Sequence, residues 1–410
     1  MSKKYSLQKE KIKILLLEGI HKSALEYFTA NGYTNVHLLP DALEADELNN
    51  HIRSANIIGI RSRTQLDKAV LGHADRLFAI GCFSIGTNQV DGFAAKMRGI
   101  PVFNAPFSNT RSVAELVISE CILLLRDIPA KNAAAHQGKW LKSASHSYEV
   151  RGKNLGIVGY GHIGSQVSVL AEALGMNVYY YDIEKKLSLG KAISCSSLEK
   201  LLGIAHMVTL HVPETPMTRN MIGAQELSKM RRGSYLVNAS RGSVVDIPAL
   251  AEALKAGQIL GAALDVFPQE PVSNSDSFIS ELRQFDNVIL SPHVGGSTLE
   301  AQENIGTEVA EKLVNYSDTG STIGATNFVQ IALQPNHDVQ RFLHIHNNVP
   351  GILKEVNYLF TSKGINITAE YLQTDPEIGY VITDTDSDLG ISVLKELKSI
   401  EGTIRVRMLY

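Results

Sequence analysis

Residues 153–164 read Lys153-Asn-Leu-Gly-Ile-Val-Gly-Tyr-Gly-His-Ile-Gly164, and this segment organises the chain around it. Its apolar start predicts a strand, and the residues after Gly164 predict a helix that ends near Gly175. The spacing G-x-G-x-x-G between a strand and a helix is typical of a dinucleotide-binding turn. Gly159 permits the tight turn, Gly161 lets backbone N–H groups approach a pyrophosphate, and Gly164 lets the helix pack on the sheet. We expect the pyrophosphate at the positive end of the helix dipole.

A second apolar strand, Val178-Tyr-Tyr-Tyr-Asp182, follows this helix and ends in an acidic residue. The carboxylate of Asp182 can accept hydrogen bonds from both ribose hydroxyls of the adenosine, and it would repel a 2′-phosphate. Glycine-rich turns are common, so the G-x-G-x-x-G spacing alone is a weak signal. The strand, helix and acid in this order make it specific, and they favour NAD over NADP.

Composition narrows the class of protein. A chain of 410 residues is long enough for two to four domains. Its net charge of −3, with no long basic run, argues against nucleic acid as a partner. The three cysteines form no C-x-x-C pair, and no apolar run is long enough to span a bilayer. We therefore expect a soluble cytoplasmic protein with reduced thiols.

Before the glycine loop, strand-like and helix-like segments alternate as in a parallel α/β sheet. The predicted strands are Ile12–Leu17, Val36–Leu39 and Ile57–Ile60. Arg61-Ser62-Arg63 follows the third strand, and ligands of open α/β sheets bind beyond the carboxyl ends of strands. The two guanidinium groups are suited to a carboxylate or phosphate. The alternative is a pair of ordinary solvated arginines.

An apolar helix is predicted from Val113 to Arg126, with Thr110 or Ser112 as its cap. Asn109, at its mouth, is expected to face the active-site cleft or to be a simple turn residue. Trp140, the only tryptophan, could anchor a subunit contact or fill its own domain.

Three later strands are expected to bring Arg241, Glu270 and His293 to one edge of the sheet, where the cofactor would bind. This set suits hydride transfer at a hydroxylated carbon, because imidazole can take the hydroxyl proton as the hydride leaves. A carboxylate would orient the ring and raise its pKa, and an arginine would hold a substrate carboxylate. Nothing in the set indicates a metal site. Taken singly, each residue could equally belong to a structural turn.

Several motifs together resemble the D-isomer-specific 2-hydroxyacid dehydrogenase family. They are Asn238-Ala-Ser-Arg241-Gly, Asp265-Val-Phe-Pro-Gln-Glu270-Pro and Ser291-Pro-His293-Val-Gly-Gly296, with the glycine loop and Asp182. The resemblance implies catalytic roles for Arg241, Glu270 and His293. The predicted cofactor-binding residues are Gly159, Gly161, His162, Ile163, Gly164, Asp182, His211, Val212, Pro213, Ala239, Ser240, Arg241, Asp265, His293, Gly295 and Gly296.

The resemblance also implies two Rossmann-like, doubly wound parallel-sheet domains. Residues 1–108 and 297–334 would form a discontinuous substrate-binding domain, with the NAD-binding domain at 109–296 inserted between them. The predicted substrate-binding residues are Arg61, Ser62, Arg63, Asn109 and Gln302. Lys142 could add charge to the site across a subunit boundary.

The C-terminal part, residues 338–410, has the order βαββαβ of a ferredoxin-like unit. The turn His346-Asn-Asn348-Val-Pro-Gly351 before its first helix resembles an ACT domain, which binds amino acids. His346, Asn348 and Asn366 match positions that contact L-serine in such domains. The alternative is a module that serves dimerisation alone.

Within the family, the match is to bacterial members that carry this module. It implies oxidation of 3-phospho-D-glycerate to 3-phosphohydroxypyruvate, the first step of L-serine biosynthesis, inhibited by L-serine. It also implies a homotetramer, and it leaves open the reduction of 2-oxoglutarate to 2-hydroxyglutarate. The alternatives are another NAD-dependent D-2-hydroxyacid dehydrogenase, or an NAD-sensing regulatory scaffold.

Overall fold

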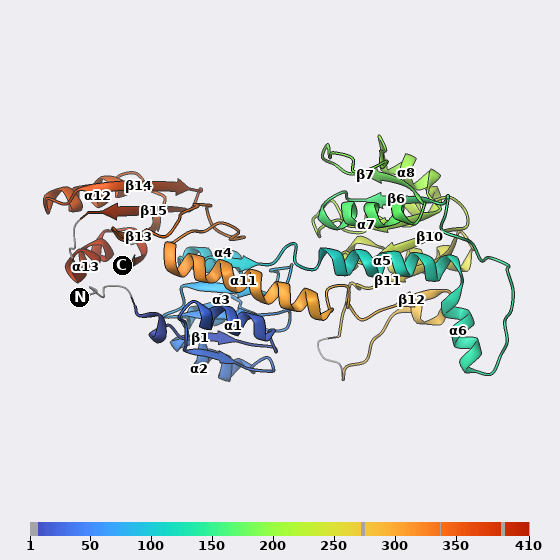
Figure 1. The fold of residues 1–410 in the computed structure, drawn as a ribbon, viewed down its shortest axis with the longest axis horizontal. Helices are drawn as coiled ribbons and strands as arrows, with labels where there is room; N and C mark the ends of the chain where they lie inside the picture. The colour runs from blue at the N-terminus through green and yellow to red at the C-terminus, as the bar shows by residue number, and fades with distance from the viewer. Residues whose placement is uncertain (1–6, 272–274, 337, 387–389, 410) are drawn as a thin grey trace. The chain divides into compact units, whose positions relative to one another are not determined.

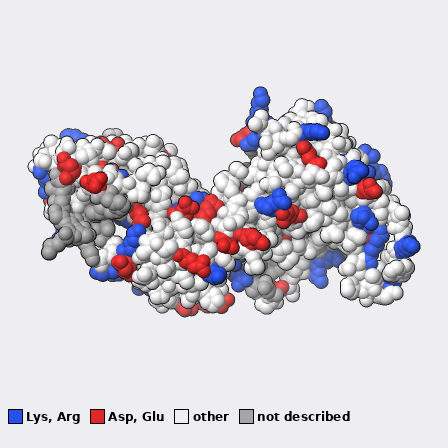
Figure 2. Space-filling view, in the orientation of Figure 1, with Lys and Arg blue, Asp and Glu red and all other residues white. Residues whose placement is uncertain are grey.

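The structure is a computed structural model that describes residues 7–271, 275–336, 338–386 and 390–409. The chain divides into two compact units, Met1–Ser108 with Gln302–Tyr410, and Asn109–Ala301. Lys and Arg as well as Asp and Glu side chains lie on the face that Figure 2 shows. In the described part of the chain, every helix is too short or too polar to cross a bilayer.

The first unit contains a five-stranded parallel sheet in the order β2-β1-β3-β4-β5 (Figure 1). Its central strands are short apolar runs buried on both faces, as expected when helices cover both sides of a parallel sheet. The strand order reverses between β1 and β3, so the loops after these two strands meet at a topological switch point. The elements are η1 (Lys9–Lys11), β1 (Ile14–Leu16), α1 (Lys22–Ala30), β2 (Val36–Leu38), α2 (Ala45–Ser54), β3 (Ile57–Ile60), α3 (Lys68–Gly72), β4 (Ala79–Cys82), α4 (Gly92–Met97), β5 (Val102–Asn104) and α11 (Leu299–Thr319).

The second unit contains a seven-stranded parallel sheet in the order β12-β11-β10-β9-β6-β7-β8. Its strand order reverses between β6 and β9. One face is covered by α5 and α7, which lie side by side (Figure 1), and the other by α8, α9 and α10. The elements are α5 (Thr110–Leu125), α6 (Ile128–His136), β6 (Asn154–Val158), α7 (His162–Ala173), β7 (Asn177–Tyr181), β8 (Ile193–Ser194), α8 (Leu198–Ile204), β9 (Met207–Leu210), α9 (Ala224–Lys229), β10 (Ser234–Asn238), η2 (Gly242–Val244), α10 (Ile247–Lys255), β11 (Ile259–Leu264), η3 (Glu281–Gln284) and β12 (Val288–Leu290).

The start of α5 differs from the prediction. Asn109 occupies the N-cap position, and its side chain makes no capping hydrogen bond. Thr110 and Ser112 lie inside the first turn, so neither can cap the helix as predicted. The hydroxyl of Ser112 instead donates to the hydroxyl of Thr298 at 3.0 Å. The apolar residues of α5 are buried against the sheet and α7, as its composition predicts.

The C-terminal module, within the first unit, is an antiparallel sheet in the order β14-β15-β13-β16. Its helices pack on one face through Phe342, Phe360 and Val393, and its other face joins the core that contains α11 through Leu343 and Tyr380. The predicted βαββαβ order is confirmed. The elements are β13 (Gln340–Asn347), α12 (Ile352–Ser362), β14 (Ile367–Thr374), β15 (Ile378–Thr385), α13 (Gly390–Ser399) and β16 (Thr403–Leu409).

A buried ion pair ties the module to the end of α11. The guanidinium of Arg341 donates to both carboxylate oxygens of Asp384, at 2.7 and 2.8 Å, and both side chains are at most 4% exposed. Arg341 also donates to the backbone carbonyl of Thr319, and Tyr380 donates to that of Gly320. The pair therefore joins two strands of the module, and Arg341 and Tyr380 bond these strands to the end of α11 and the residue after it.

We predict that Arg341→Met destabilises the module by about 3–5 kcal/mol, because it leaves the Asp384 carboxylate buried without its cation. The measurement is the free energy of unfolding in urea, followed by far-ultraviolet circular dichroism. The double variant Arg341→Met/Asp384→Leu should recover most of the loss, since it removes both charges. A single variant as stable as the wild type would contradict this account of the pair.

Candidate active site

The three glycines of the loop after β6 meet different geometric demands. Gly159 has φ 89°, and a Cβ there would lie 2.3 Å from the carbonyl oxygen of His211. A Cβ on Gly164 would lie 2.1 Å from the carbonyl oxygen of Gly159, so the first turn of α7 packs directly on the loop. Gly161, at the N-cap of α7, has open space around it. The crowded glycines shape the turn, and the open one leaves room for a phosphate group.

Asp182, the residue after β7, is hydrogen-bonded to this loop. Its Oδ2 accepts a hydrogen bond from the backbone N–H of Tyr160 at 2.8 Å, and its Oδ1 accepts one from Glu184 at 2.9 Å. These bonds orient the carboxylate beside the glycine turn and leave lone pairs for further donors. The predicted role of Asp182 is to accept hydrogen bonds from the adenosine ribose hydroxyls.

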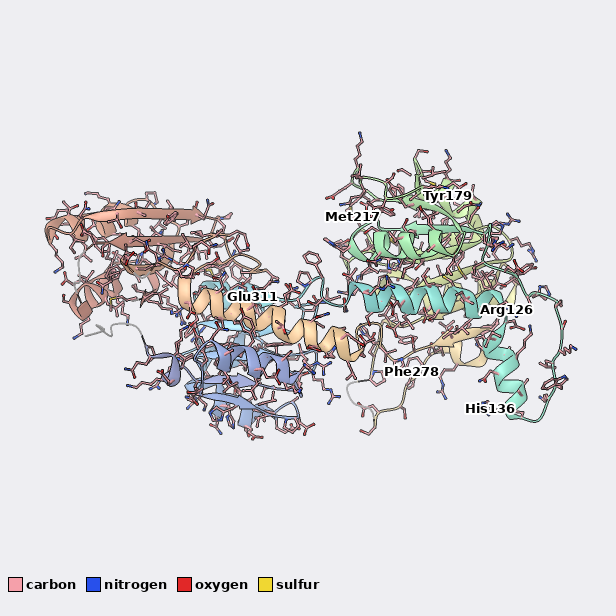
Figure 3. All side chains as sticks on the ribbon, in the orientation of Figure 1. Arg126, His136, Tyr179, Met217, Phe278 and Glu311 are labelled. Carbon is pink, nitrogen blue, oxygen red and sulfur yellow. The ribbon has the colours of Figure 1, made fainter. Side chains whose placement is uncertain are left out.

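His211, Val212 and Pro213 follow β9, the neighbour of β6 across the point where the strand order reverses. Burial lowers the pKa of His211 to about 3, and its Nε2 contacts the Thr209 hydroxyl at 3.0 Å. The ring is therefore neutral near pH 7 and cannot accept a substrate proton and hold it as a cation. The same loop continues to Met217, which is exposed (Figure 3).

A buried carboxylate, Asp265, follows β11 and holds the loop after β12. The side chain is 1% exposed. Its Oδ1 accepts hydrogen bonds from the Ser291 hydroxyl at 2.7 Å and from the Val294 N–H at 2.8 Å. Its Oδ2 accepts one from the Gly295 N–H at 2.7 Å. These bonds flank His293 on both sides and fix its backbone, which has φ 55°.

The imidazole of His293 pairs with Glu270. Nδ1 of the ring lies 2.8 Å from Oε2 of Glu270, whose Oε1 accepts a hydrogen bond from the Phe267 N–H. The hydrogen bond that His293 donates to Glu270 raises the pKa of His293 and outweighs burial, which lowers it. Burial raises the pKa of Glu270, but the bonds from His293 and Phe267 bring it below its usual range. Because Nδ1 is engaged by the carboxylate, Nε2 is the nitrogen available for proton transfer.

Arg241 lies at the carboxyl end of the adjacent strand β10. The loop is shaped by Asn238, which is fully buried: its Oδ1 accepts from the backbone and hydroxyl of Ser240, and its Nδ2 donates to the Arg241 carbonyl. The Arg241 guanidinium donates to the Ser240 carbonyl at 2.7 Å and is partly exposed. Its charge lowers the pKa of both Glu270 and His293, so its field reaches the pair.

The second unit therefore gathers most of the predicted residues at one edge of its sheet. Within this unit, Asn109 lies against Gly296, where a Cβ would come within 2.5 Å of its Nδ2. The remaining predicted cofactor residues lie at the start of α7 (His162, Ile163), after β10 (Ala239, Ser240) and beside His293 (Gly295, Gly296).

Arg61, Ser62, Arg63 and Gln302 belong to the first unit. There the loop after β3 is held by Glu18, whose carboxylate accepts from the backbone N–H groups of Arg61, Arg63 and Thr64 at 2.9–3.1 Å. Glu18 is the residue of the loop after β1 at the switch point. Ser62 and Arg63 are exposed, and burial lowers the pKa of Arg61. Three backbone N–H groups of the loop are thus occupied by Glu18, and the two guanidinium groups are the cations that the loop can offer an anion.

Sequence reasoning missed three residues that shape these sites. Glu18 could have been noticed as an acid directly after a buried strand, at the same sheet edge as Arg61. Asn238 and Ser291 lie inside the quoted motifs. The Asn238 side chain holds the backbone of the Arg241 loop, and the Ser291 hydroxyl donates to the buried Asp265 carboxylate. Their positions next to Arg241 and His293 were the available signal.

In the C-terminal module, the predicted effector residues are divided between two ends of the sheet. Asn348 lies just before α12, where its Nδ2 donates to the carbonyl of Asp375 at 2.6 Å. His346 is 3% exposed, and its ring lies where a Cβ on Gly379 would be. Asn366 precedes β14 at the opposite end and donates to Asp386 at 3.2 Å. One chain therefore does not bring Asn366 to Asn348.

Two segments of the chain match the domain models of known protein families. Residues 118–295 match the NAD-binding domain of the D-isomer specific 2-hydroxyacid dehydrogenases, and residues 342–405 match the AHAS small subunit-like ACT domain. The chain belongs to the D-isomer-specific 2-hydroxyacid dehydrogenase family. The predicted family, NAD-binding domain and ACT domain are confirmed.

The names of similar proteins point to one activity within this family. The chain is 57% identical to a D-3-phosphoglycerate dehydrogenase of Haemophilus influenzae over 100% of both chains. It is 58% identical to the enzyme of the same name from Escherichia coli, over 99% of this chain and 100% of that one. Among solved structures, a D-lactate dehydrogenase of Aquifex aeolicus, complexed with NAD and lactic acid, is 26% identical with a TM-score of 0.64. That match covers 74% of this chain and 95% of the other.

We predict that Gly164→Ala weakens NADH binding and destabilises the second unit by about 1–3 kcal/mol, the usual cost of overpacking. The added methyl group would displace the Gly159 carbonyl and with it the glycine turn. NADH affinity is measured by fluorescence titration, and stability by thermal unfolding. Gly203→Ala, in α8 with open space around it, is the matched control. Unchanged NADH affinity in Gly164→Ala would contradict the role given to this contact.

We predict that Glu270→Gln moves the pH dependence of catalysis toward lower pH. With His293 as the predicted base, we expect oxidation to need the neutral ring, so that kcat/KM for oxidation rises with pH through the pKa of the ring. Reduction would need the protonated ring and be lost above this pKa. Removing the carboxylate charge lowers this pKa, so both profiles should shift in the same direction. The measurement is kcat/KM against pH in each direction. Profiles that coincide with those of the wild type would show that Glu270 does not set the pKa of His293.

Proposed function

We propose that the chain catalyses NAD-dependent oxidation of 3-phospho-D-glycerate to 3-phosphohydroxypyruvate, the first step of L-serine biosynthesis. The observation that carries the proposal is the hydrogen bond between His293 Nδ1 and Glu270, at the sheet edge that the glycine loop also occupies. It leaves Nε2 free as a base. Identities of 57–58% over the whole length to enzymes named for this substrate support the choice within the family.

Each residue then has one task in the reaction. His293 Nε2 takes the C2 hydroxyl proton while the C2 hydrogen leaves as hydride, and the imidazolium that forms is stabilised by Glu270. NAD, when bound, supplies the hydride acceptor. Arg241 holds the substrate carboxylate and polarises the C2 oxygen. The proton later passes from His293 to solvent, and reduction follows the same steps in reverse.

Arg241 accounts for the substrate carboxylate, and the substrate phosphate needs further cationic side chains. We assign the phosphate to Arg61 and Arg63, whose loop is kept in shape by Glu18. Ser62, Asn109 and Gln302 complete the predicted substrate set. The guanidinium forks suit a phosphate better than a point charge does, because they can donate two parallel hydrogen bonds.

L-Serine is the proposed effector of the C-terminal module. His346 and Asn348 would bind it in one chain, and Asn366 would come from a second copy, since the two ends of one sheet are far apart. This division supports an oligomer, and a homotetramer is proposed. The three-domain division at 1–108 with 297–334, 109–296 and 338–410, the cytoplasmic location and a 2-oxoglutarate reductase activity belong to the same proposal.

The test is a spectrophotometric assay of NADH oxidation with phosphohydroxypyruvate, titrated with L-serine. The expected result is rapid NADH oxidation that L-serine suppresses. Glyoxylate and 2-oxoglutarate serve as alternative substrates. Preference for glyoxylate would assign the chain to a different hydroxyacid oxidoreductase, and no turnover with any substrate would favour an NAD-sensing scaffold.

We predict that Asn348→Ala raises the L-serine concentration for half-inhibition by about 10-fold or more, the loss of one to two good hydrogen bonds. Activity without serine should stay within about twofold of the wild type, since the module is not part of the chemistry. The check is inhibition measured beside Asn357→Ala, an asparagine of α12 away from the helix mouth. Undiminished sensitivity would move the effector site elsewhere.

A further inference from the structure

Helix α4 of the first unit is joined to the C-terminal module by a cluster of charges. Nζ of Lys96 lies 3.1 Å from Oδ2 of Asp375 and 2.6 Å from Oε2 of Glu377. The Lys96 side chain is 15% exposed, so water screens this contact less than it would at the open surface. Burial lowers the pKa of Lys96, but the hydrogen bonds that its ammonium group donates to Glu377 and Asp375 outweigh this effect, so the pKa is raised.

Asp375 and Glu377 lie in the turn between β14 and β15, and this turn touches the proposed effector residue. The side-chain amide of Asn348 donates to the Asp375 carbonyl, and its backbone N–H donates to the Glu377 carbonyl at 2.9 Å. Oδ1 of Asp375 accepts from the N–H groups of Glu377 and Ile378, which makes the turn rigid. A ligand that forms a hydrogen bond with the Asn348 side-chain amide would therefore break its bond to the turn, and this turn is ion-paired with Lys96.

The other end of α4 is bonded to the loop that carries the substrate-binding arginines. Asp91 caps the helix by accepting from Ala94, and its own N–H donates to the Leu66 carbonyl at 2.9 Å. Gln89, two residues earlier, accepts from the Leu66 N–H and donates to the carbonyl of Arg61. A six-residue helix thus separates the effector turn from the Arg61 loop.

The contact is not limited to one lysine. Arg405 of β16 donates to the carbonyl of Arg98, which ends α4, at 3.2 Å. The next residue, Gly99, has φ 65° and lies where a Cβ would come within 3.2 Å of Arg405 and Ile345. The C-terminal end of α4 therefore contacts the sheet of the module as well as the turn between β14 and β15.

We propose that the Lys96–Asp375–Glu377 cluster couples effector binding to the Arg61–Arg63 loop through α4. This inference rests on the proposed function, because it names how L-serine acts on the same site. A ligand changes activity only if it binds one arrangement better than another. In the first arrangement, the turn between β14 and β15 is hydrogen-bonded to Asn348 and ion-paired with Lys96. In the second, the bound amino acid has replaced the hydrogen bond between Asn348 and the turn. The shift of α4 changes the position of the arginines that receive the substrate phosphate.

The test compares Lys96→Met with Lys68→Met, an exposed lysine on α3, in the full-length protein. L-Serine binding is measured by isothermal titration calorimetry, and inhibition by the NADH assay. In Lys96→Met, serine affinity should stay within about threefold of the wild type, while the concentration for half-inhibition rises at least about fivefold. Activity without serine should be unchanged in both variants.

A second set of variants, in which the two charges are exchanged, tests the proposal even if Lys96→Met alters the packing of α4. Glu377→Lys alone should weaken inhibition, and the double variant Lys96→Glu/Glu377→Lys should restore much of it. Hydrogen exchange of the α4 amides should respond to L-serine in the wild type and not in Lys96→Met. Inhibition of Lys96→Met equal to that of the wild type would overturn the coupling and leave the enzyme and its effector intact. A wild type that neither binds L-serine nor is inhibited by it would instead remove the effector assignment, and this coupling with it.

Discussion

The Asp265 carboxylate accepts three hydrogen bonds from the loop after β12, and the arrangement of the proposed catalytic side chains depends on them. A buried carboxylate is costly unless donors satisfy it, so the loop can adopt few other conformations without losing that stabilisation. The bonds to Val294 and Gly295 place His293 at a left-handed backbone conformation, which turns its ring toward Glu270. Glu270 follows the same strand as Asp265. One strand therefore supplies both the anchor of the histidine loop and the partner of the histidine ring.

The parallel sheets explain why residues so far apart in the chain share one site. Every strand of a parallel sheet ends at the same edge, and ligands bind where the strand order reverses. In the second unit this edge gathers the glycine turn, Arg241, Glu270 and His293. In the first unit the same rule brings Glu18 to the Arg61 loop. The fold thus provides positions, and a few polar residues in the loops provide the chemistry.

Much of this could be predicted from the sequence, and the reasons are physical. The glycine turn could be predicted because only glycine fits its crowded positions. Asp182 could be predicted because it ends the strand that follows the turn and its helix. The proposed catalytic residues each follow a strand of a parallel sheet, so their convergence at one sheet edge could be predicted from the sequence. Other features depend on contacts between segments distant in sequence. Glu18 meets the Arg61 loop only after the sheet forms, and Lys96 meets Glu377 across 281 residues of chain. The start of α5 was misplaced because capping residues compete within one turn, and local sequence does not decide between them. The separation of Asn366 from Asn348 follows from sheet register, which turn motifs do not reveal.

The most direct test of the account is the rate of hydride transfer from NADH to phosphohydroxypyruvate, measured by stopped-flow absorbance in the wild type and in His293→Ala. We predict that the variant transfers hydride at least about 100-fold more slowly, because a general acid–base usually contributes at least this factor. NADH affinity should change little, because the glycine loop and Asp182 remain. Hydride transfer at a near-normal rate in His293→Ala would contradict the central claim, since another group would then supply the proton.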